Sequence, residues 1–288
     1  MSPYSTSFKF DTVAIVDALG PGEDPQTGVW VRDTVLAPLA KTHAVKLSHN
    51  KVTSRSELMQ LLVSIERLVR DVGIAPILHF ESHGTEQGIQ MPDASVVLWG
   101  DLRPILTEIN RGCKMNLLTV MGMCHGRHLV SQLLPTDASP VWALIGPVDE
   151  ILPSRLQIGF ESFYRELLST LDSRAAVQAM NAHRGDRPRD LWIDVAEIVF
   201  CRVFRSYISE HCSLEQLAAR ENVLVERVTR QSNYDIRAAM QARTMARELL
   251  EDQTKAFEHF RRTFLMLDTF PENANRFAWR LDDCLGTT

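Results

Sequence analysis

Two residues that can act together chemically, a histidine and a cysteine, each follow an apolar run of the sequence. His83 stands in Glu-Ser-His-Gly after the run APILHF (75–80), and Cys124 stands in Met-Cys-His-Gly at the end of NLLTVMGM (116–123). A cysteine attacks a carbonyl carbon as the thiolate, and a nearby imidazole can activate the thiol or protonate the leaving amine. We therefore treat His83 and Cys124 as a candidate pair of general acid/base and nucleophile.

The neighbours of this pair fit the needs of the same reaction. Attack on a carbonyl creates an oxyanion, which backbone N–H groups stabilise. Gly84 has no side chain to shield its N–H, and the N–H of Cys124 itself is the second candidate donor. Glu81 and Glu86 flank His83, and either carboxylate could orient the imidazole.

The elements that must position the pair alternate between strand and helix. Five short apolar runs predict strands at 12–17, 44–47, 75–80, 116–123 and 141–145, and a hairpin is expected over 85–99. In an open parallel sheet, ligands bind beyond the carboxyl ends of the strands. If the strands that precede His83 and Cys124 are neighbours, both side chains project into the same crevice.

Apolar residues at three- and four-residue spacing predict three helices in the same half of the chain, over 58–69, 102–109 and 156–171. Ser54 and Glu57 form a capping box before the first helix, and Gly73 is a typical stop after it. Pro104 is tolerable in the first turn of the second helix. The alternation predicts an α/β fold, a mostly parallel sheet with helices on both faces.

The character of the chain changes near residue 181. The segment 183–189 reads HRGDRPR, which is typical of a linker, and from Leu191 onward only helical periodicity is found. Helices are expected from 191, over 214–229, and over 235–267 with Pro271 ending the last one. We predict one domain over 1–184 and a helical subdomain over 185–288.

With these elements in place, the residues resemble a known family. A strand ending in His-Gly, about forty residues before a strand ending in Cys, is the arrangement of the caspase-type (clan CD) cysteine peptidases; here the two residues are 41 positions apart. The segment 141–164, VWALIGPVDEILPSRLQIGFESFY, is most similar to the bacterial CHAT-domain proteases. The resemblance covers roughly residues 10–180. It implies a caspase-like fold and a cysteine endopeptidase that acts on protein substrates without a metal or another cofactor.

The sequence also departs from the family pattern. Caspases carry Gln-Ala-Cys-x-Gly around the nucleophile, whereas this chain has Gly-Met-Cys-His-Gly, so a preference for aspartate at P1 is not expected. In separase and CHAT-type relatives, an acidic residue after the next strand selects Arg or Lys. Asp149 matches that position best and Glu150 is the second candidate, so the resemblance implies a basic P1 residue. Peptidases of this kind are often effectors switched on by a sensor or partner, and the C-terminal helices could dock such an activating protein.

Rival interpretations use the same residues. His125 and His128 lie closer to Cys124 in sequence, but a histidine directly after a nucleophile at a strand end normally points away from it. Zinc would need two close Cys/His pairs, and the sequence offers only the cluster around Cys124 and the pair His211–Cys212. We expect no metal.

Composition narrows the function classes further. The 288 residues are 45% hydrophobic, which allows a substantial core, and the net charge of −5 gives no reason to expect nucleic acid as a partner. No run reaches the ~18 apolar residues of a membrane span, and the N-terminus lacks the pattern of a signal peptide. Five irregularly spaced cysteines indicate free thiols in a reducing compartment, with Cys113 and Cys201 as packing residues. A cytoplasmic protein is expected.

The loop Gly20–Gly28 has three glycines but no P-loop Lys-Ser/Thr, so we expect a mobile surface loop or one wall of the cleft. Three functions remain: an endopeptidase, a catalytically inactive adaptor with the same fold, and a thiol hydrolase or acyltransferase acting on a small molecule. The adaptor predicts a filled crevice or diverging side chains. The small-molecule enzyme predicts a closed pocket, and a strand edge open beside the cleft would favour peptides.

Overall fold

The computed structural model describes residues 8–23, 25–131, 133–182, 191–211, 213–231, 237, 240–241, 243–244 and 253–286. The chain forms two compact units, the first made of Met1–Leu133 and Ser139–Ala196, the second of Leu134–Ala138 and Glu197–Thr288. The predicted linker at 183–189 lies outside the described residues.

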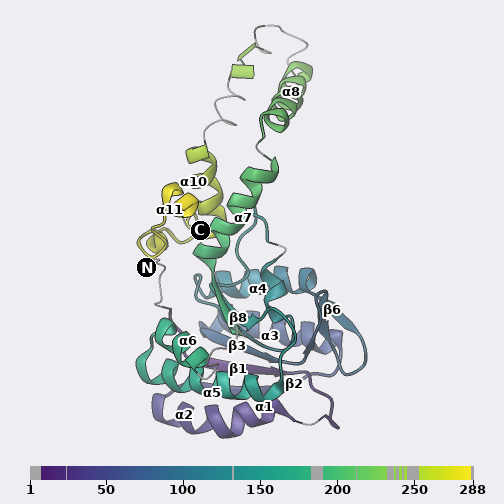
Figure 1. Ribbon diagram of the computed structural model, residues 1–288, viewed down its shortest axis with the longest axis vertical. Coiled ribbons are helices and arrows are strands. Elements are labelled where there is room, and N and C mark those ends of the chain that lie inside the picture. Colours follow the sequence, from purple (N-terminus) through teal and green to yellow (C-terminus); the bar gives the residue numbers. More distant parts are fainter. Residues whose placement is uncertain are drawn as a thin grey trace. The chain divides into compact units, whose positions relative to one another are not determined.

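A six-stranded sheet forms the centre of the first unit, with the strand order β2-β1-β3-β7-β8-β9 (Figure 1). The parallel strands are β1 (Thr12–Asp17), β2 (Lys46–Lys51), β3 (Pro76–Glu81), β7 (Leu118–Gly122) and β8 (Ala143–Pro147). Every residue of β1, β3, β7 and β8 is buried, which explains why these strands read as continuous apolar runs rather than as alternating ones. The predicted α/β fold with a mostly parallel sheet is confirmed.

The sixth strand, β9 (Leu191–Val195), corrects a prediction. These residues were expected to begin a helix, but they pair antiparallel with β8, from Ala143 opposite Val195 to Pro147 opposite Leu191. A segment of five residues is too short for its periodicity to separate strand from helix. The helix α7 (Ala196–His211) follows directly. The chain therefore enters the second unit at Glu197, after β9.

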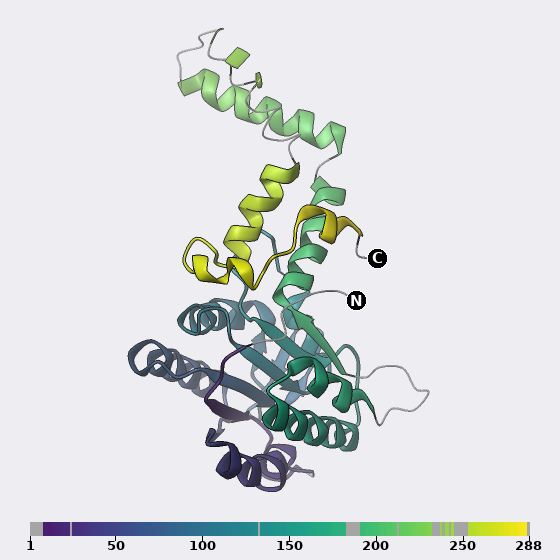
Figure 2. The ribbon, with the colours of Figure 1, turned by 90° about the vertical axis from the view of Figure 1, so that its left-hand side faces the viewer.

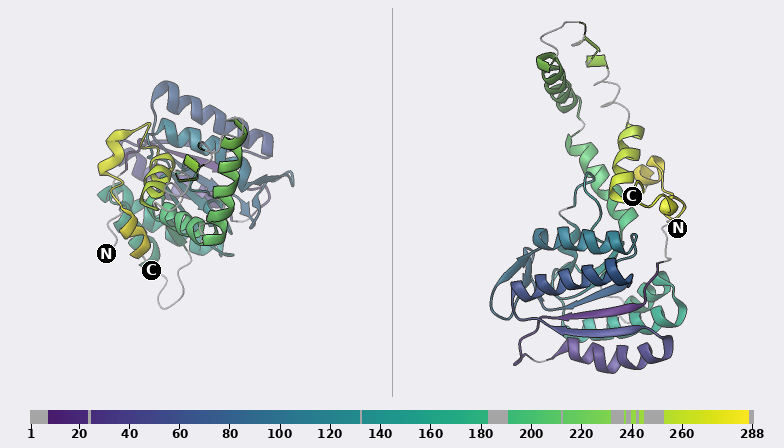
Figure 3. Two further views of the ribbon diagram at one scale, coloured as in Figure 1. Left: turned by 90° about the horizontal axis from the view of Figure 1, so that it is seen from above. Right: turned by 180° about the vertical axis from the view of Figure 1, so that it is seen from behind.

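Helices cover both faces of this sheet (Figures 1 and 3). One face carries α3 (Arg55–Val72) and α4 (Trp99–Gly112). The other carries α1 (Thr27–Trp30), η1 (Val31–Leu36), α2 (Ala37–His43), α5 (Pro153–Thr170) and α6 (Ser173–Ala182). Because α4 already begins at Trp99, Pro104 lies inside the helix rather than in its first turn as predicted. There it removes the N–H that would bond one turn back.

Helix α3 follows its sequence signals closely. The Ser54 side chain accepts the Glu57 N–H at 3.2 Å, and Gly73 ends the helix in the left-handed conformation, with φ of 79°. The Glu57 carboxylate accepts the N–H of Thr53 at 2.7 Å, which completes the cap one residue earlier than a capping box would.

A small antiparallel sheet projects from the region after β3. It has the order β4-β5-β6 and consists of β4 (His83–Gly84), β5 (Gly88–Gln90) and β6 (Val96–Leu98). The predicted hairpin is therefore present, and His83 and Gly84 form its third strand. Strand β6 lies at one edge of this sheet.

The second unit contains helices in all its described elements: α7, α8 (Leu214–Gln231), α10 (Gln253–Phe264), η3 (Pro271–Asn275) and α11 (Leu281–Gly286). Helix α10 ends at Phe264, so Pro271 does not end it but begins η3. Much of the long helix predicted over 235–267 lies outside the described residues. No helix in the described part of the chain is both long and apolar enough to cross a bilayer.

A disulfide between Cys201 and Cys284 joins α7 to α11, which lie side by side in this unit (Figure 2). The prediction that all cysteines are free thiols is therefore wrong for these two residues, 83 positions apart. Sequence spacing could not reveal the pair because the chain must fold back before the two sulfurs meet. The argument from free thiols to a cytoplasmic location loses its basis.

Candidate active site

The residues expected to do chemistry follow two neighbouring strands. In the pairing of β3 with β7, Glu81 stands opposite Gly122. His83 and Cys124 each come two residues later, so both follow the carboxyl ends of neighbouring strands. We call this side of the sheet its carboxyl edge. The sequence left open whether these two strands are neighbours, and the structure shows that they are.

Gly84 brings the two segments into direct contact. A Cβ atom at this position would lie 2.0 Å from the carbonyl oxygen of Cys124 and 2.9 Å from Cγ of Met123. No side chain fits at such distances, so glycine is required by the approach of the two backbones. The sequence suggested Gly84 for its unshielded N–H, and the structure adds this steric reason.

An open cavity of about 850 Å³ lies at this edge. One side is formed by Gly84–Gln87 and Val96, and the other by Cys124, His125 and Glu150–Leu152. The Cys124 thiol is partly exposed, and its Sγ lies 3.9 Å from the carbonyl oxygen of Ile151. The candidate nucleophile is thus accessible from a hollow large enough for several residues of a peptide.

The imidazole of His83 makes its contact away from this cavity. Its side chain is 63% exposed, and Nε2 lies 2.5 Å from Oε2 of Glu23. His83 does not contribute to the cavity wall, although Gly84 does. Among the hydrogen bonds of the described residues, none joins His83 to Cys124. Such bonds are often long before substrate binds.

Glu23 was not found from the sequence, which pointed to Glu81 or Glu86 as the carboxylate that orients His83. In the register of the parallel strands β1 and β3, Asp17 at the end of β1 stands opposite Glu81 at the end of β3. The loop after β1 therefore lies beside His83, which no local motif could indicate because the contact spans 60 positions.

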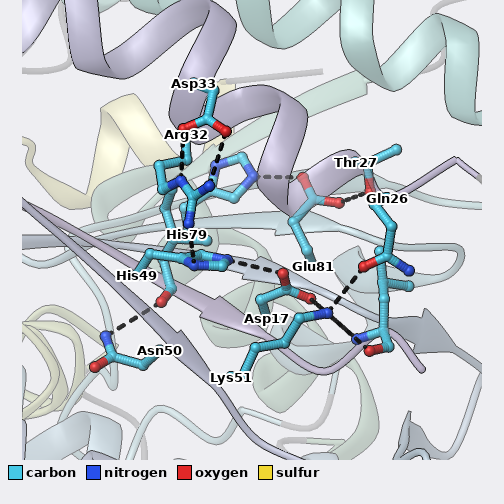
Figure 4. Close-up of polar contacts among 12 residues, drawn as sticks. Asp17, Gln26, Thr27, Arg32, Asp33, His49, Asn50, Lys51, His79 and Glu81 are labelled. Carbon is cyan, nitrogen blue, oxygen red and sulfur yellow. Dashed lines mark hydrogen bonds and ion pairs between the residues drawn. The ribbon is translucent and has the colours of Figure 1, made fainter. Parts of the chain in front are cut away.

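Glu81 has a different role, in a buried chain of hydrogen bonds (Figure 4). Its carboxylate accepts the hydroxyl of Thr27 and contacts Nε2 of His79 at 2.6 Å. Nδ1 of His79 lies 2.8 Å from the hydroxyl of Tyr164, on α5. Burial, together with the nearby Glu81 carboxylate, raises the pKa of Tyr164 well above its ordinary value. These hydrogen bonds connect β3 to α1, through Thr27, and to α5, through Tyr164, on one face of the sheet.

Of the two acidic residues expected to contact a substrate side chain, the structure places Glu150 in the cavity wall. Asp149, the first choice, is exposed, and its carbonyl oxygen accepts the N–H of His125 at 3.3 Å. Glu86 lines the opposite side of the cavity. The wall therefore carries two carboxylates and neither lysine nor arginine.

His125 contributes to the same wall as Cys124. Its backbone is left-handed, with φ of 56°, and its ring is anchored by Nδ1 at 3.2 Å from the carbonyl oxygen of Val148. The His128 ring packs edge-on against it, with centroids 5.5 Å apart. Within the described residues, no group of three or more His, Cys, Asp or Glu is arranged to hold a metal ion.

The other free cysteine that the structure describes differs sharply from Cys124. Burial, with a smaller effect of Asp11, raises the pKa of Cys113 to about 12. Cys113 is 7% exposed, as expected of a packing residue.

Comparison with known proteins adds no assignment. No family model matches the sequence, and no curated protein is significantly similar to it.

Proposed function

We propose that the protein is a cysteine endopeptidase of the caspase-like type, most similar to the CHAT group, with Cys124 as nucleophile and His83 as general acid/base. The observation that carries the proposal is the meeting of two strand ends. It places Gly84 on the backbone of Cys124, at the wall of an open cavity. In the parallel sheet of an α/β fold, this edge is where ligands bind.

Each residue has a role in the reaction. His83 takes the proton of the Cys124 thiol, the thiolate attacks the scissile carbonyl carbon, and His83 then gives this proton to the amine that leaves as the C–N bond breaks. The N–H groups of Gly84 and Cys124 are the proposed donors to the oxyanion. Water then hydrolyses the thioester with His83 as base. Glu23 holds Nε2 of His83, which leaves Nδ1 for the reacting groups.

A peptide fits this site better than a small molecule. The cavity is open rather than closed, and Val96 in its wall belongs to β6, an edge strand. Extended peptides commonly add to sheet edges. The carboxylates of Glu86 and Glu150 favour a cationic side chain near the nucleophile, which supports cleavage after Arg or Lys. The helices of the second unit remain our candidate for binding an activating protein.

One observation favours the second candidate, a catalytically inactive adaptor. The His83 imidazole rests on Glu23 and lies outside the cavity wall. Catalysis needs this ring within hydrogen-bond reach of the reacting groups once substrate binds. An adaptor would keep the fold and the cavity without that movement.

A fluorogenic peptide library that spans all P1 residues separates the two. We expect cleavage after Arg or Lys that disappears in Cys124→Ala and in His83→Ala, while His43→Ala, at the end of α2, cleaves normally. Glu150→Ala should weaken cleavage after Arg and Lys more than Asp149→Ala does. Cleavage that survives Cys124→Ala would overturn the nucleophile assignment. Absence of all cleavage, also with cell extract added to supply an activator, would favour the adaptor.

A further inference from the structure

We propose that Lys51 and Gln26 are positioning residues that hold the Glu23 carboxylate on His83. The loop after β1 is then a built part of the candidate site rather than a mobile surface loop. The inference rests on the proposed function for its effect on catalysis. Its structural content, a fixed carboxylate on the His83 ring, can be tested separately.

Lys51 is the last residue of β2, and each N–H donor of its ammonium group has a hydrogen-bond acceptor. Its Nζ donates to Oδ1 of Asp17 at 3.2 Å, to the carbonyl oxygen of Leu19 at 3.0 Å and to Oε1 of Gln26 at 2.9 Å (Figure 4). An ammonium has three N–H donors, and each has one acceptor, from the end of β1 or from the loop that follows it. Lys51 thereby fixes both the start of the loop and the Gln26 amide.

The amide of Gln26 is equally well satisfied. Its Nε2 donates to the carbonyl oxygens of Gly20, at 2.7 Å, and Glu23, at 2.8 Å. With Oε1 on Lys51, the amide has only one orientation that pairs donors with acceptors. The side chain therefore spans the turn that carries Glu23 and holds both of its ends.

Within this turn, Glu23 is held at both carboxylate oxygens. Oε1 accepts the N–H of Gly20 at 2.6 Å, while Oε2 lies 2.5 Å from Nε2 of His83. The Glu23 N–H donates back to the carbonyl oxygen of Gly20 at 3.2 Å. A Cβ on Gly20 would lie 2.8 Å from Glu23 Oε1, so glycine gives the carboxylate room.

Lys51, Gln26 and Glu23 together form a clamp on His83. This clamp is anchored on Asp17, whose side chain is fully buried. Oδ1 of Asp17 also accepts the Leu19 N–H at 3.1 Å, and Oδ2 lies 2.8 Å from Nε2 of His49. Nδ1 of His49 contacts a guanidinium nitrogen of Arg32 at 3.1 Å. Because a guanidinium only donates, Nδ1 accepts and Nε2 carries the hydrogen that is donated to Asp17. Polar contacts thus lead from the buried end of β1 to the exposed ring of His83.

The consequence is a defined role for the ring. A carboxylate held on Nε2 keeps a hydrogen on that nitrogen, so Nδ1 is the nitrogen left to exchange a proton when the ring reaches the reacting groups. The Glu23–His83 pair is partly exposed, at 34% and 63%, and exposed pairs contribute modestly. Loss of the clamp should therefore lower kcat about fivefold and leave KM unchanged.

The test combines histidine NMR with kinetics on Glu23→Gln, Lys51→Met and Gln26→Leu. Lys46→Met, at the exposed start of the same strand, is the matched control. Long-range 1H–15N spectra report which ring nitrogen of His83 carries the hydrogen, with His83→Asn for assignment. We expect Lys51→Met and Gln26→Leu to alter the His83 signals as Glu23→Gln does, and Lys46→Met to leave them unchanged. The Glu23→Gln/Lys51→Met double variant should lose no more activity than Glu23→Gln alone.

The result that overturns the inference is a His83 spectrum altered by Glu23→Gln but not by Lys51→Met or Gln26→Leu. If Lys51→Met fails to fold, as judged by thermal denaturation, Gln26→Leu decides alone. If no peptide is cleaved, the spectra still decide the inference, and only the proposed function fails. Equal losses of activity in Lys46→Met and Lys51→Met would indicate a general effect of charge and would contradict the clamp.

Discussion

At the scale of single residues, the candidate site depends on backbone contacts that side chains would prevent. Gly84 allows the chain after His83 to touch the carbonyl of Cys124, and Gly122 makes room for Glu81. A Cβ on Gly122 would lie 2.5 Å from Oε1 of that carboxylate. Both glycines stand at the edge of the sheet from which the candidate pair projects. They keep the two strand ends close together.

Gly84→Ala should abolish most of the activity. The new methyl group would lie 2.0 Å from the Cys124 carbonyl oxygen, so the two segments must separate. Displacing a reacting group by about 1 Å can lower the rate about a hundredfold. Gly286→Ala is the control because its Cβ meets nothing within 4 Å and it lies far along the chain from the candidate site. Measurements of kcat/KM on the best library peptide check this, and normal activity of Gly84→Ala would contradict the geometry.

The two free cysteines that the structure describes, Cys113 and Cys124, should react very differently with iodoacetamide. The pKa of Cys113 is raised to about 12 by burial, so at pH 8 it carries almost no thiolate. Cys124 is partly exposed in an open cavity. Peptide mapping after brief alkylation of the folded protein should find the label on Cys124 and not on Cys113. In denaturant both should react, and labelling of Cys113 in the folded state would show that the core opens.

At the scale of elements, the sequence predicted those helices and strands whose signals lie in residues close together along the chain. Helix α3 has its own start and stop signals, and the buried strands are rich in apolar residues because helices cover both faces of the sheet. Strand β9 was missed because its pairing partner, β8, lies about 45 residues earlier in the chain. Glu23 was missed for the same reason. Its contact with His83 depends on the order of the strands, which periodicity does not reveal.

Strand β9 is bound to the segment that follows the nucleophile. The Arg127 guanidinium, three residues after Cys124, contacts both oxygens of Asp194 and lies 5.0 Å from the ring centre of Trp192. Asp194 is 1% exposed, and its hydrogen bonds raise the pKa of Arg127. The pair connects η2 (Gly126–Val130) to the edge of the sheet and thereby steadies the loop that carries Cys124.

Arg127→Met should lower the free energy of unfolding by about 3 kcal/mol, because it removes a guanidinium that contacts both oxygens of the buried Asp194 carboxylate. The value is at the lower end for such pairs because Arg127 is 22% exposed. Arg111→Met is the control. Its pair with Glu108, on the surface of α4, spans 3.4 Å between exposed side chains and should contribute under about 1 kcal/mol. Urea denaturation of both variants measures the difference, and equal losses would argue against a special role for the Arg127 pair.

At the scale of the whole molecule, the two units are stabilised in different ways. The first has a sheet buried between two helical layers. The second is stabilised in its described part by aromatic packing, with Phe200 against Phe257 and Phe264, and by the Cys201–Cys284 disulfide. Closing a long loop restricts the unfolded chain most, so the bond matters more to this unit than its local contacts suggest.

Removal of this disulfide should therefore destabilise the second unit selectively. For a separation of 83 residues, the chain-entropy model gives about 4–5 kcal/mol. Calorimetry of the Cys201→Ala/Cys284→Ala variant should show one transition moved to lower temperature, while the transition of the first unit, followed through the alkylation of the buried Cys113, stays in place. If mapping of unreduced protein finds both thiols free, or if the variant melts like the wild type, the disulfide does not stabilise this unit.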